Sequence, residues 1–514
     1  MRELIIDNFA GGGGASTGIE LALGRSVDIA INHDEAAIAM HKVNHPRTKH
    51  YLEDVWEVDP LEATQGRPVG LAWFSPDCKH FSKAKGGKPV EKSIRGLAWV
   101  AVKWAKAVRP RVIILENVEE FKTWGPLTED NYPDPKRKGE TFNLFIRALK
   151  KLGYKVDFRE LKACDYGAPT IRKRFFMVAR CDGRKIIWPE PTHGDPDTLA
   201  VRAGILEPWR TAAECIDWSI ACPSIFERKK PLAENTVQRI TRGINKFVLE
   251  NPRPFIMQAY GGGYTGAGSD IDRPLPTITA TDHNWLVTPF LSQYHSYDDT
   301  PRGQTMDRPL LTQDTSNRYG LVACYLTKFY KTGIGQDLAE PLHTVTTSPG
   351  HFGEIRAFLT SYYGNESDIG QSLDEPLRTI TVKDRFGDVS VKITKVGKRN
   401  DLKHWPKVRE MLNQYCGFNI ASDEILLLEI SGDHYFINDI GLRMLVPHEL
   451  FAAQGFPRDY IIDRDENGKP FTKKDQVAKC GNAVCPDLAK ALVSANLPEL
   501  YVGMEDGDMD EVAL

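Results

Sequence analysis

The sequence predicts an α/β protein whose core is a doubly wound, Rossmann-like parallel sheet, interrupted by a large and mainly β insertion. Apolar strand patterns alternate with helical patterns up to about residue 190, and α/β character returns near the C-terminus. Between these parts, a short segment occurs four times at about residues 260–390. We therefore expect an α/β domain over residues 1–195, an inserted region over 196–437 and a return to the α/β domain over 438–514.

The composition is that of an ordinary soluble globular protein. The chain has 514 residues, enough for about two to four domains, with 41% hydrophobic and 26% charged residues. A net charge of −3 argues against a protein that binds nucleic acid over a uniformly basic surface. It is compatible with a local basic cleft. Nine cysteines without a CxxC pair favour reduced thiols over disulfides or zinc, so we expect no metal. Since there is no signal peptide or membrane-length apolar run, we expect a cytoplasmic protein with no membrane partner.

The first predicted unit is a strand, a glycine-rich turn and a helix. Leu4-Ile5-Ile6 is a buried-strand pattern, and Asp7-Asn8-Phe9-Ala10 leads into four glycines, Gly11 to Gly14. A helical pattern begins near Ala15. In this geometry the backbone approaches a nucleotide-like ligand closely, although the glycines alone are equally compatible with a merely tight turn.

Acidic residues follow the next predicted elements. The second strand, Val27 to Ile31, ends just before His33 and Asp34. A carboxylate after the second strand is where the hydroxyl pair of a ribose is bound in such sheets. Asp34 could instead cap the helix that follows it. Asp54 is a further acidic position downstream.

The most informative stretch runs from Leu71 to Pro89. The apolar run Leu71 to Phe74 predicts a buried strand that ends abruptly at Ser75-Pro76-Asp77-Cys78. We expect this break to present Cys78 at the carboxyl edge of the sheet, where open α/β sheets bind ligands. The lysines of the following loop would lower the pKa of the thiol, whereas an isolated free cysteine is more often an inert core residue.

Further charged groups are predicted at the same edge. The strand Arg111 to Leu115 ends at Glu116, which places a carboxylate at the sheet edge that carries the cysteine, although a capping or surface glutamate is the common alternative. Arg172 and Arg174 precede the strand Phe175 to Ala179. They could point two guanidinium groups at an anion or a base edge, or form a solvated face.

The inserted region contains the repeats. Helical patterns cover roughly residues 211–249, and then a Pro-Leu-x-Thr step occurs at Pro274, Pro309, Pro341 and Pro376. Each step follows an aromatic residue and a loop rich in Gly, Asp and Ser. A hairpin of this kind cannot bury its apolar face alone, so we expect the four repeats to stack.

Taken in order, the motifs resemble those of the cytosine-5 DNA methyltransferases of bacteria and phages, which use S-adenosylmethionine. DNFAGGGG resembles the glycine-rich cofactor motif of that family, and Ser75 to Cys78 with Phe81-Ser82 resembles its Pro-Cys loop. Glu116-Asn117-Val118 matches its Glu-Asn-Val motif, and Tyr166 to Arg174 resembles its paired-arginine motif. RMLVPHELFAAQGFP and GNAV match its closing motifs. The resemblance covers about residues 1–190 and 440–495 and puts the insertion where the family carries its target-recognition domain.

The sequence departs from the family pattern at several positions. Asp77 lies between Pro76 and Cys78, which are adjacent in the family. The other departures are Lys79 and Thr170, each in place of a usual Gln, and His33, in place of an acidic ribose ligand. We retain Cys78 as the nucleophile because no other cysteine follows a strand and a proline break beside Phe-Ser.

The resemblance implies a role for each matched residue. Cys78 would add to carbon 6 of a flipped cytosine, and Glu116 would need a raised pKa to donate a hydrogen bond to N3. Arg172 would contact the ring carbonyl, and Arg174 would orient the loop. The candidates for binding S-adenosylmethionine, and its product S-adenosylhomocysteine, are Phe9, Gly11, Gly13, Asp34, Asp54, Pro76 and Asn482. The implied partner is double-stranded DNA in a bacterial cytoplasm, as in restriction-modification, and we expect a monomer.

Two alternatives from other classes stay open. The first is a catalytically inactive DNA-binding relative of this family, which the inserted Asp77 leaves open. The second is a nicotinamide-dependent or other small-molecule α/β enzyme that shares only the glycine-rich turn. The second alternative does not explain a large repeat region inserted between two parts of one sheet.

Overall fold

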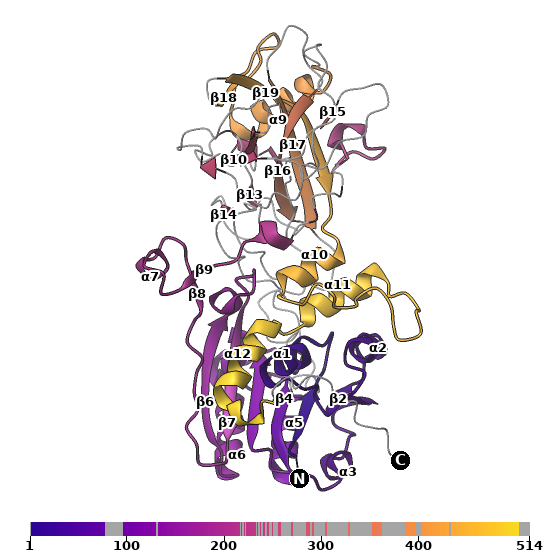
Figure 1. Ribbon diagram of the computed structural model, residues 1–514, viewed down its shortest axis with the longest axis vertical. Coiled ribbons are helices and arrows are strands. Elements are labelled where there is room, and N and C mark those ends of the chain that lie inside the picture. Colours follow the sequence, from indigo (N-terminus) through magenta and orange to yellow (C-terminus); the bar gives the residue numbers. More distant parts are fainter. Residues whose placement is uncertain are drawn as a thin grey trace. The chain divides into compact units, whose positions relative to one another are not determined.

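The computed structural model describes residues 2–77, 96–129, 132–215, 402–430 and 433–502, together with 217, 220, 223–232 and short stretches between 234 and 395. The chain, coloured along its sequence in Figure 1, divides into two compact units. Unit 1 comprises Met1–Trp209, Ile380–Val382 and Leu450–Leu514, and unit 2 comprises Arg210–Thr379 and Lys383–Glu449. Among the described residues, the helices are all too short or too polar to cross a membrane.

Unit 1 contains a seven-stranded sheet in the order β3-β2-β1-β4-β5-β7-β6. Its strands are β1 (Leu4–Asn8), β2 (Ile29–Asn32), β3 (Lys49–Leu52), β4 (Val69–Phe74), β5 (Val112–Asn117), β6 (Lys155–Lys162) and β7 (Lys173–Arg180). The neighbours from β3 to β5 are parallel, which confirms the predicted doubly wound α/β fold. Apolar residues dominate β1, β4 and β5 because both faces of these strands are covered.

The sheet departs from the parallel arrangement at one edge, where β7 runs antiparallel to both β5 and β6. The chain between β6 and β7 holds only the short 3₁₀ helix η4 (Ala163–Tyr166) and a turn. A parallel return needs a crossover of about a dozen residues or more, usually a helix, so β7 pairs antiparallel instead. This reversal places the start of β7 beside the end of β5, with Phe176 opposite Glu116.

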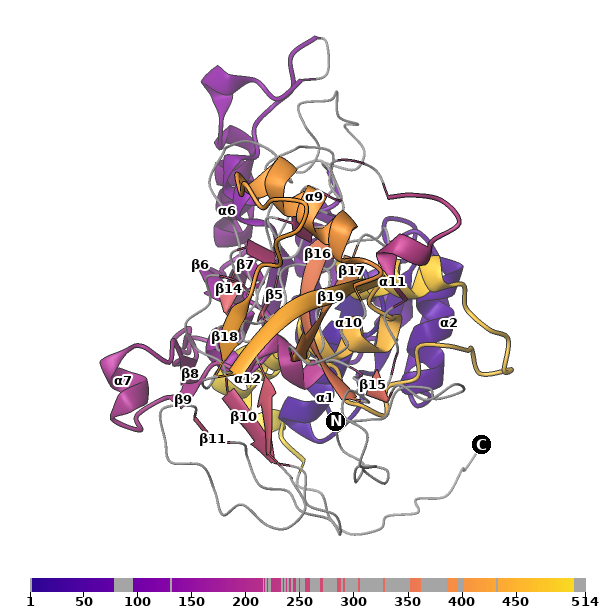
Figure 2. The same ribbon diagram turned by 90° about the horizontal axis from the view of Figure 1, so that it is seen from above.

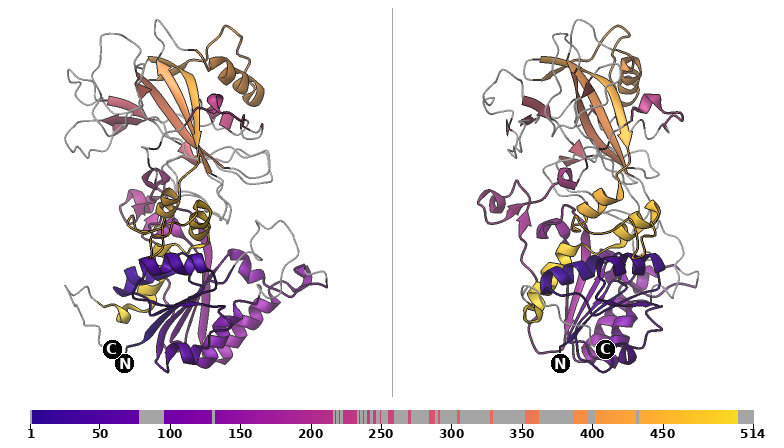
Figure 3. Two further views of the ribbon diagram at one scale, coloured as in Figure 1. Left: turned by 90° about the vertical axis from the view of Figure 1, so that its right-hand side faces the viewer. Right: turned by 45° about the vertical axis from the view of Figure 1, so that its right-hand side comes forward.

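Helices cover both faces of this sheet (Figure 3). The α-helices that lie wholly in the described part of unit 1 are α1 (Gly14–Leu23), α2 (Glu35–Asn44), α3 (Pro60–Thr64), α5 (Trp99–Ala107), α6 (Glu140–Lys151), α7 (Leu199–Arg202), α11 (Lys473–Asn482) and α12 (Pro486–Asn496). The short elements of unit 1 are β8 (His193–Gly194), β9 (Glu207–Pro208), η2 (Glu119–Thr123), η3 (Pro135–Arg137) and η8 (Pro498–Leu500).

The core lies in two layers, one on each face of the sheet. Along β4, Leu71 and Trp73 pack with α1 and α12, whereas Ala72 and Phe74 pack with α5 and α6. This alternation follows from the two-residue period of a strand. Because α12 belongs to the last part of the chain, the residues that follow the insertion complete the core begun by the first part.

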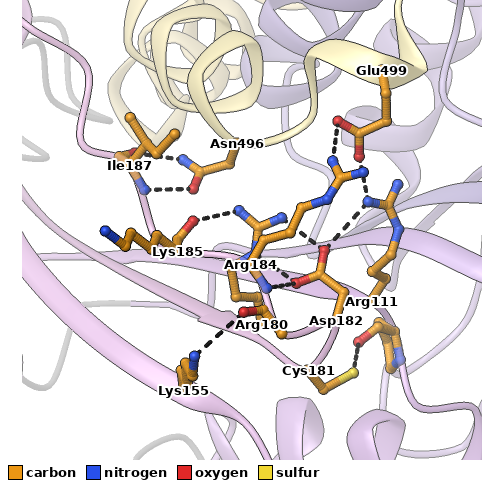
Figure 4. A network of polar contacts seen from close by, with 12 residues as sticks. Arg111, Lys155, Arg180, Cys181, Asp182, Arg184, Lys185, Ile187, Asn496 and Glu499 are labelled. Carbon is orange, nitrogen blue, oxygen red and sulfur yellow. Dashed lines mark hydrogen bonds and ion pairs between the residues drawn. The ribbon is translucent and has the colours of Figure 1, made fainter.

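A network of charged groups joins the C-terminal residues to the edge of the sheet where β5 begins and β7 ends (Figure 4). Arg111 Nη2 donates to Glu3 Oε2 at 2.6 Å, and the same guanidinium pairs with Glu499. Asp182 accepts from Arg180 at 2.7 and 2.9 Å, and this hydrogen bonding is the main reason why its pKa falls to about 2.

A second polar network lies under the glycine-rich turn. Ser16 Oγ donates to Asp7 Oδ2 at 2.7 Å, and His41 Nε2 lies 2.9 Å from the same hydroxyl. His41 Nδ1 in turn lies 2.8 Å from His50 Nε2. Burial raises the pKa of Asp7 to about 7, although the hydrogen bonds to Ser16 oppose it, and burial lowers the pKa of His41. The network therefore favours neutral groups beneath the turn.

Unit 2 is mainly β, as expected for the insertion. Its larger sheet contains β13 (Phe290–Leu291), β14 (Gln304–Thr305), β15 (Thr327–Lys328), β16 (Phe352–Ser361), β17 (Phe386–Lys395), β18 (Leu428–Ile430) and β19 (Asp433–Arg443). A smaller sheet contains β10 (Phe255–Gln258), β11 (Ser269–Asp270) and β12 (Asn284–Val287). The strands β16, β17 and β19 lie side by side and antiparallel, as Figure 2 shows. The four Pro-Leu-x-Thr steps lie outside the described residues, so their stacking stays a prediction.

The helical prediction for residues 211–249 is wrong in its first half. The described residues there form two short 3₁₀ helices, η5 (Ala212–Cys215) and η6 (Ile225–Glu227). Ser224 starts the second of these helices separately, because its hydroxyl accepts a hydrogen bond from Phe226 N at 3.2 Å. A proline at position 223 also cannot donate a backbone hydrogen bond to a continuous helix.

The first closing motif contains a buried ion pair in unit 2. Arg443 Nη2 and Nη1 donate to the two carboxylate oxygens of Glu449 at 2.9 and 3.0 Å. Val446 N also donates to Glu449 Oε2 at 2.8 Å. These bonds join the end of β19 to the start of α10 (Pro447–Ala453), so these two charges of the motif have a structural role. The helix α9 (Trp405–Cys416) packs nearby on β19.

Replacing Arg111 by Met should destabilise unit 1 by about 2 kcal/mol, because Glu3 loses a charged partner in a partly buried place and Glu499 keeps its pair with Arg184 alone. Urea unfolding at neutral pH measures this loss. Arg137→Met is the matched control, since Arg137 makes a comparable pair with Glu140 at 2.6 Å on the exposed surface. If the two substitutions lower the free energy of unfolding equally, the network contributes no more to stability than an exposed ion pair.

Replacing Asp7 by Asn should remove a pH dependence of stability. With a pKa of about 7 in the folded protein, Asp7 binds its proton more tightly than in the unfolded chain. Its contribution to stability is therefore present at low pH and is lost as the pH rises from about 4 to about 7. Relative to the variant, the wild type should lose on the order of 4 kcal/mol over this range.

Urea unfolding at a series of pH values measures the difference between the two proteins. The opposite effect of His41 is present in both and cancels to first order. Parallel pH profiles would show that Asp7 is ionised throughout.

Candidate functional site

Three neighbouring strands of unit 1 end at the same edge of the sheet. Asn8 at the end of β1 pairs with Phe74 at the end of β4, and Phe74 pairs with Leu115 of β5. Phe9 and Ser75 directly follow β1 and β4, and Glu116 is the next residue of β5 after Leu115, so all three lie at the same edge of the sheet. Cys78 itself lies outside the described residues, which reach Asp77 on this side.

The turn that leads to Cys78 is held by two buried asparagines. Asn117 Nδ2 donates to the carbonyl oxygen of Pro76 at 3.0 Å, and Asn8 Nδ2 donates to that of Trp73 at 3.3 Å. The ring nitrogen of Trp73 donates to Ser75 Oγ at 2.8 Å. Asn117 was not among the predicted site residues, although it stands in the quoted Glu-Asn-Val motif. It fixes the backbone two residues before the predicted nucleophile.

The structure brings Glu116 and Arg174 together. Arg174 Nε lies 3.3 Å from Glu116 Oε1, and both side chains are almost completely buried. Burial raises the pKa of Glu116, and the charges of Arg174 and Arg172 offset this only in part. The carboxyl group therefore holds a proton more readily than an exposed glutamate, as the predicted hydrogen bond to a ring nitrogen requires.

Arg172 is tied to the second closing motif. Its Nη1 donates to the carbonyl oxygen of Gly481 at 3.1 Å, and its backbone N–H donates to Thr170 Oγ1 at 3.3 Å. Thr170, which departs from the family pattern, is fully buried and supports the arginine through its hydroxyl group. Arg172 and Arg174 therefore lie two positions apart at the start of β7, one held by the C-terminal segment and the other by Glu116.

The glycine-rich turn combines close packing with one open position. Ala10 is tied to β2 by hydrogen bonds to Ile31 O at 3.0 Å and from Asn32 Nδ2 at 2.9 Å. Gly13 has φ 86°, and a side chain at Gly14 would overlap the carbonyl oxygen of Val484. At Gly11, by contrast, no heavy atom of the described residues other than the glycine and its two chain neighbours lies within 4 Å of the position a Cβ would occupy.

The predicted cofactor residues therefore differ in their surroundings. Phe9 adopts φ 65° at the start of the turn, and the carbonyl of Pro76 is engaged by an asparagine. Asp34 caps α2 by accepting from Ala37 N at 3.0 Å, as its alternative interpretation predicted. Asp54 is exposed and accepts from Trp56 N at 2.9 Å, and Asn482 is exposed at the end of α11. The hydrogen bonds of the described residues join none of these five side chains to one another.

Three of the four thiols in the described part of unit 1 differ from a reactive cysteine. Cys164, Cys480 and Cys485 are buried, and burial raises the pKa of each, that of Cys485 to about 12. A buried thiol in these surroundings stays protonated and is a poor nucleophile.

Two residues near the turn gave no sequence signal. The hydroxyl of Tyr460 donates to Gly12 O at 2.7 Å, and Lys479 pairs with Asp34. Both come from the C-terminal segment, and neither belongs to the quoted motifs. Their contacts depend on how two distant parts of the chain pack, which a local pattern does not reveal.

Comparison with known proteins identifies the first part of unit 1. Residues 4–203 match the family described as C-5 cytosine-specific DNA methylase. The type II methyltransferase M.AquIA of Picosynechococcus sp. is 28% identical over 235 residues, which are 42% of this chain and 88% of that protein. The type II methylase M.HgiDII of Herpetosiphon aurantiacus is 31% identical over 210 residues, 39% of this chain and 53% of that protein.

Among solved structures, the S. pombe Dnmt2 methyltransferase aligns over 98% of this chain and 100% of its own, with a TM-score of 0.44 and 12% identity. The matched residues 4–203 contain the glycine-rich turn, Glu116 and both arginines of the site described above. Residues 4–203 therefore form a domain of the C-5 cytosine-specific DNA methylase family.

Proposed function

We propose that the protein is an active DNA (cytosine-5-)-methyltransferase that uses S-adenosylmethionine. One structural observation supports catalytic activity in addition to the similarity to the family. Glu116 is buried, has a raised pKa and lies 3.3 Å from Arg174, at the edge where the strand before Cys78 ends. A protonated carboxyl group at this position is what the chemistry of a cytosine ring requires.

The proposed reaction begins with Cys78. Carbon 5 of cytosine is a poor nucleophile, so a thiolate must first add to carbon 6 and convert the ring to an enamine. Cys78 would supply this thiolate. The raised pKa values of Cys164, Cys480 and Cys485 support this assignment, because these thiols stay protonated.

The addition increases electron density on the ring, and two side chains would stabilise it. Protonated Glu116 would donate to N3 and accept from the exocyclic amine, and Arg172 would donate to the ring carbonyl. Arg174 would hold Glu116 in place. Carbon 5 of the enamine would take the methyl group, and loss of the proton from carbon 5 with expulsion of Cys78 as thiolate would then restore the aromatic ring.

The glycine-rich turn fits a nucleoside cofactor. The open space at Gly11 allows close approach to the backbone, and Asp34 stands after β2, where ribose hydroxyls are bound in doubly wound sheets. Phe9, Gly13, Asp54, Pro76 and Asn482 are the other residues proposed for this site. When bound, S-adenosylmethionine would supply a methyl group carried on a sulfonium ion.

The proposed DNA substrate needs both units of the chain. A base inside a duplex is out of reach of Cys78 and Glu116, so the target cytosine must be flipped out of the stack. We propose that the inserted region, residues 196–437, binds double-stranded DNA and selects the site. We also propose that the protein is a monomer and that it acts in a bacterial cytoplasm in restriction-modification; the bacterial sources of the similar type II methyltransferases support the bacterial location.

Replacing Cys78 by Ser should abolish methyl transfer while leaving the fold intact. The assay follows a labelled methyl group from S-adenosylmethionine into mixed-sequence duplex DNA, and bisulfite sequencing identifies the modified base. A duplex containing 5-fluorocytosine should form a covalent adduct with the wild type and not with the variant. Cys181→Ser is the control, because this half-buried thiol lies at the opposite edge of the sheet and donates to Pro110 O.

Two results would contradict the proposal in different ways. Methylation by Cys78→Ser would exclude Cys78 as the nucleophile. DNA binding by the wild type without methyl transfer would instead identify an inactive relative.

Replacing Glu116 by Gln should lower kcat by about 10²–10⁴-fold, because the amide cannot supply the proton that the ring nitrogen needs. Single-turnover methylation measures the chemical step, and DNA affinity should change little. Glu119→Gln is the control, since Glu119 lies three positions further on and pairs with Lys173 at 3.3 Å on the surface. A rate for Glu116→Gln within about threefold of the wild type would exclude this role.

A further inference from the structure

Lys479 is a buried lysine that approaches the glycine-rich turn from the C-terminal segment. It lies in α11, and only 10% of its side chain is exposed. A Cβ at Gly12 would lie 3.1 Å from Lys479 Cβ and 3.3 Å from Lys479 O. The stem of the lysine therefore packs directly on the turn, and the glycine makes this approach possible.

The ammonium group of Lys479 reaches the carboxylate at the end of β2. It donates to Asp34 Oδ2, while Asp34 Oδ1 accepts from Ala37 N at 3.0 Å. The backbone N–H of Asp34 donates to Asn32 Oδ1 at 2.9 Å, which also restrains this residue. Each oxygen of the carboxylate thus has its own donor, one from α2 and one from α11.

The charge of Asp34 follows from these contacts. Partial burial would raise its pKa, but the hydrogen bond and charge of Lys479 and the amides at the start of α2 outweigh burial and lower the pKa. Asp34 is therefore anionic at neutral pH. Its side chain is 43% exposed, so the carboxylate is held in a defined orientation while still accessible to a ligand.

We propose that Lys479 is a positioning residue for the cofactor, which orients the carboxylate of Asp34 toward the ribose hydroxyls of S-adenosylmethionine. This inference rests on the proposed function and adds a residue outside the quoted motifs. Without the ammonium group, the carboxylate would keep only its bond to the helix amide and could rotate toward solvent. Because Lys479 and Asp34 are 445 positions apart, the cofactor site would be complete only when the C-terminal segment is docked. By linkage, bound cofactor should stabilise that docking.

The test measures the dissociation constant of S-adenosylhomocysteine by titration calorimetry. Lys479→Met keeps the apolar stem on Gly12 but removes the charge, and it should weaken binding about tenfold. Lys479→Arg should restore most of the affinity. Asp34→Asn should weaken binding as well, and the Lys479→Met, Asp34→Asn double variant should be no weaker than Asp34→Asn alone, because Lys479 acts through Asp34.

A matched control separates positioning from general docking of the C-terminal segment. Lys42 of α2 pairs with Glu466 at 3.7 Å, which is another contact between the same parts of the chain. Lys42→Met should leave the affinity within about twofold of the wild type. In steady-state assays, Lys479→Met should raise KM for S-adenosylmethionine about tenfold with little change in kcat, a split that general destabilisation would not produce.

The outcomes distinguish this inference from the proposed function. If the wild type fails to bind S-adenosylhomocysteine, the proposed function is wrong. If the wild type binds and Lys479→Met binds equally well, or if the two substitutions are additive, the positioning role is excluded. Should Lys479→Met fail to fold, Lys479→Gln replaces it in the same measurements and must show the same loss of affinity.

Discussion

The structure depends on the close approach of the C-terminal segment to the glycine-rich turn and α1. A side chain at Gly14 would overlap the carbonyl oxygen of Val484, and one at Gly18 would overlap that of Pro486. The backbone of α1 therefore contacts the backbone of the C-terminal segment at two places. The apolar faces of α1 and α12 form one core layer. The hydrogen bond from Arg172 to Gly481, the bond from Tyr460 to Gly12 and the pair of Lys479 with Asp34 all require this approach. The site thus depends on a contact between the two ends of the chain.

Burial has opposite chemical uses at different positions of unit 1. It raises the pKa of Glu116 and of the thiols of Cys164 and Cys480. For the thiols, this suppresses the nucleophilic form, whereas for the carboxyl group it favours the protonated form that can donate a hydrogen bond. The charges of Arg174 and Arg172 limit the rise in the pKa of Glu116. The carboxyl group therefore favours the protonated form and can still ionise. Burial therefore keeps these thiols unreactive and makes the carboxyl group of Glu116 a better hydrogen-bond donor.

The antiparallel strand β7 explains how the arginines reach the site. In an all-parallel sheet, residues at the start of this strand would lie at the edge opposite to the end of β5. Because β7 is reversed, Lys173 to Phe175 start beside Asn117, and Arg174 meets Glu116. The sequence motif identified the arginines, but only the strand direction makes them neighbours of the carboxyl group.

The sequence by itself determined the alternation of strands and helices, because apolar periodicity and glycine turns are local properties of the chain. It also determined the family, since several short motifs occur in a fixed order, and it singled out Glu116, Arg172 and Arg174. It did not reveal the reversal of β7, the bond from Asn117 to Pro76 or the pair of Lys479 with Asp34. These features join residues that lie far apart along the chain, or depend on how neighbouring strands pack. Only the tertiary structure decided them, because the free energy that selects such contacts comes from packing the whole core and not from any one segment.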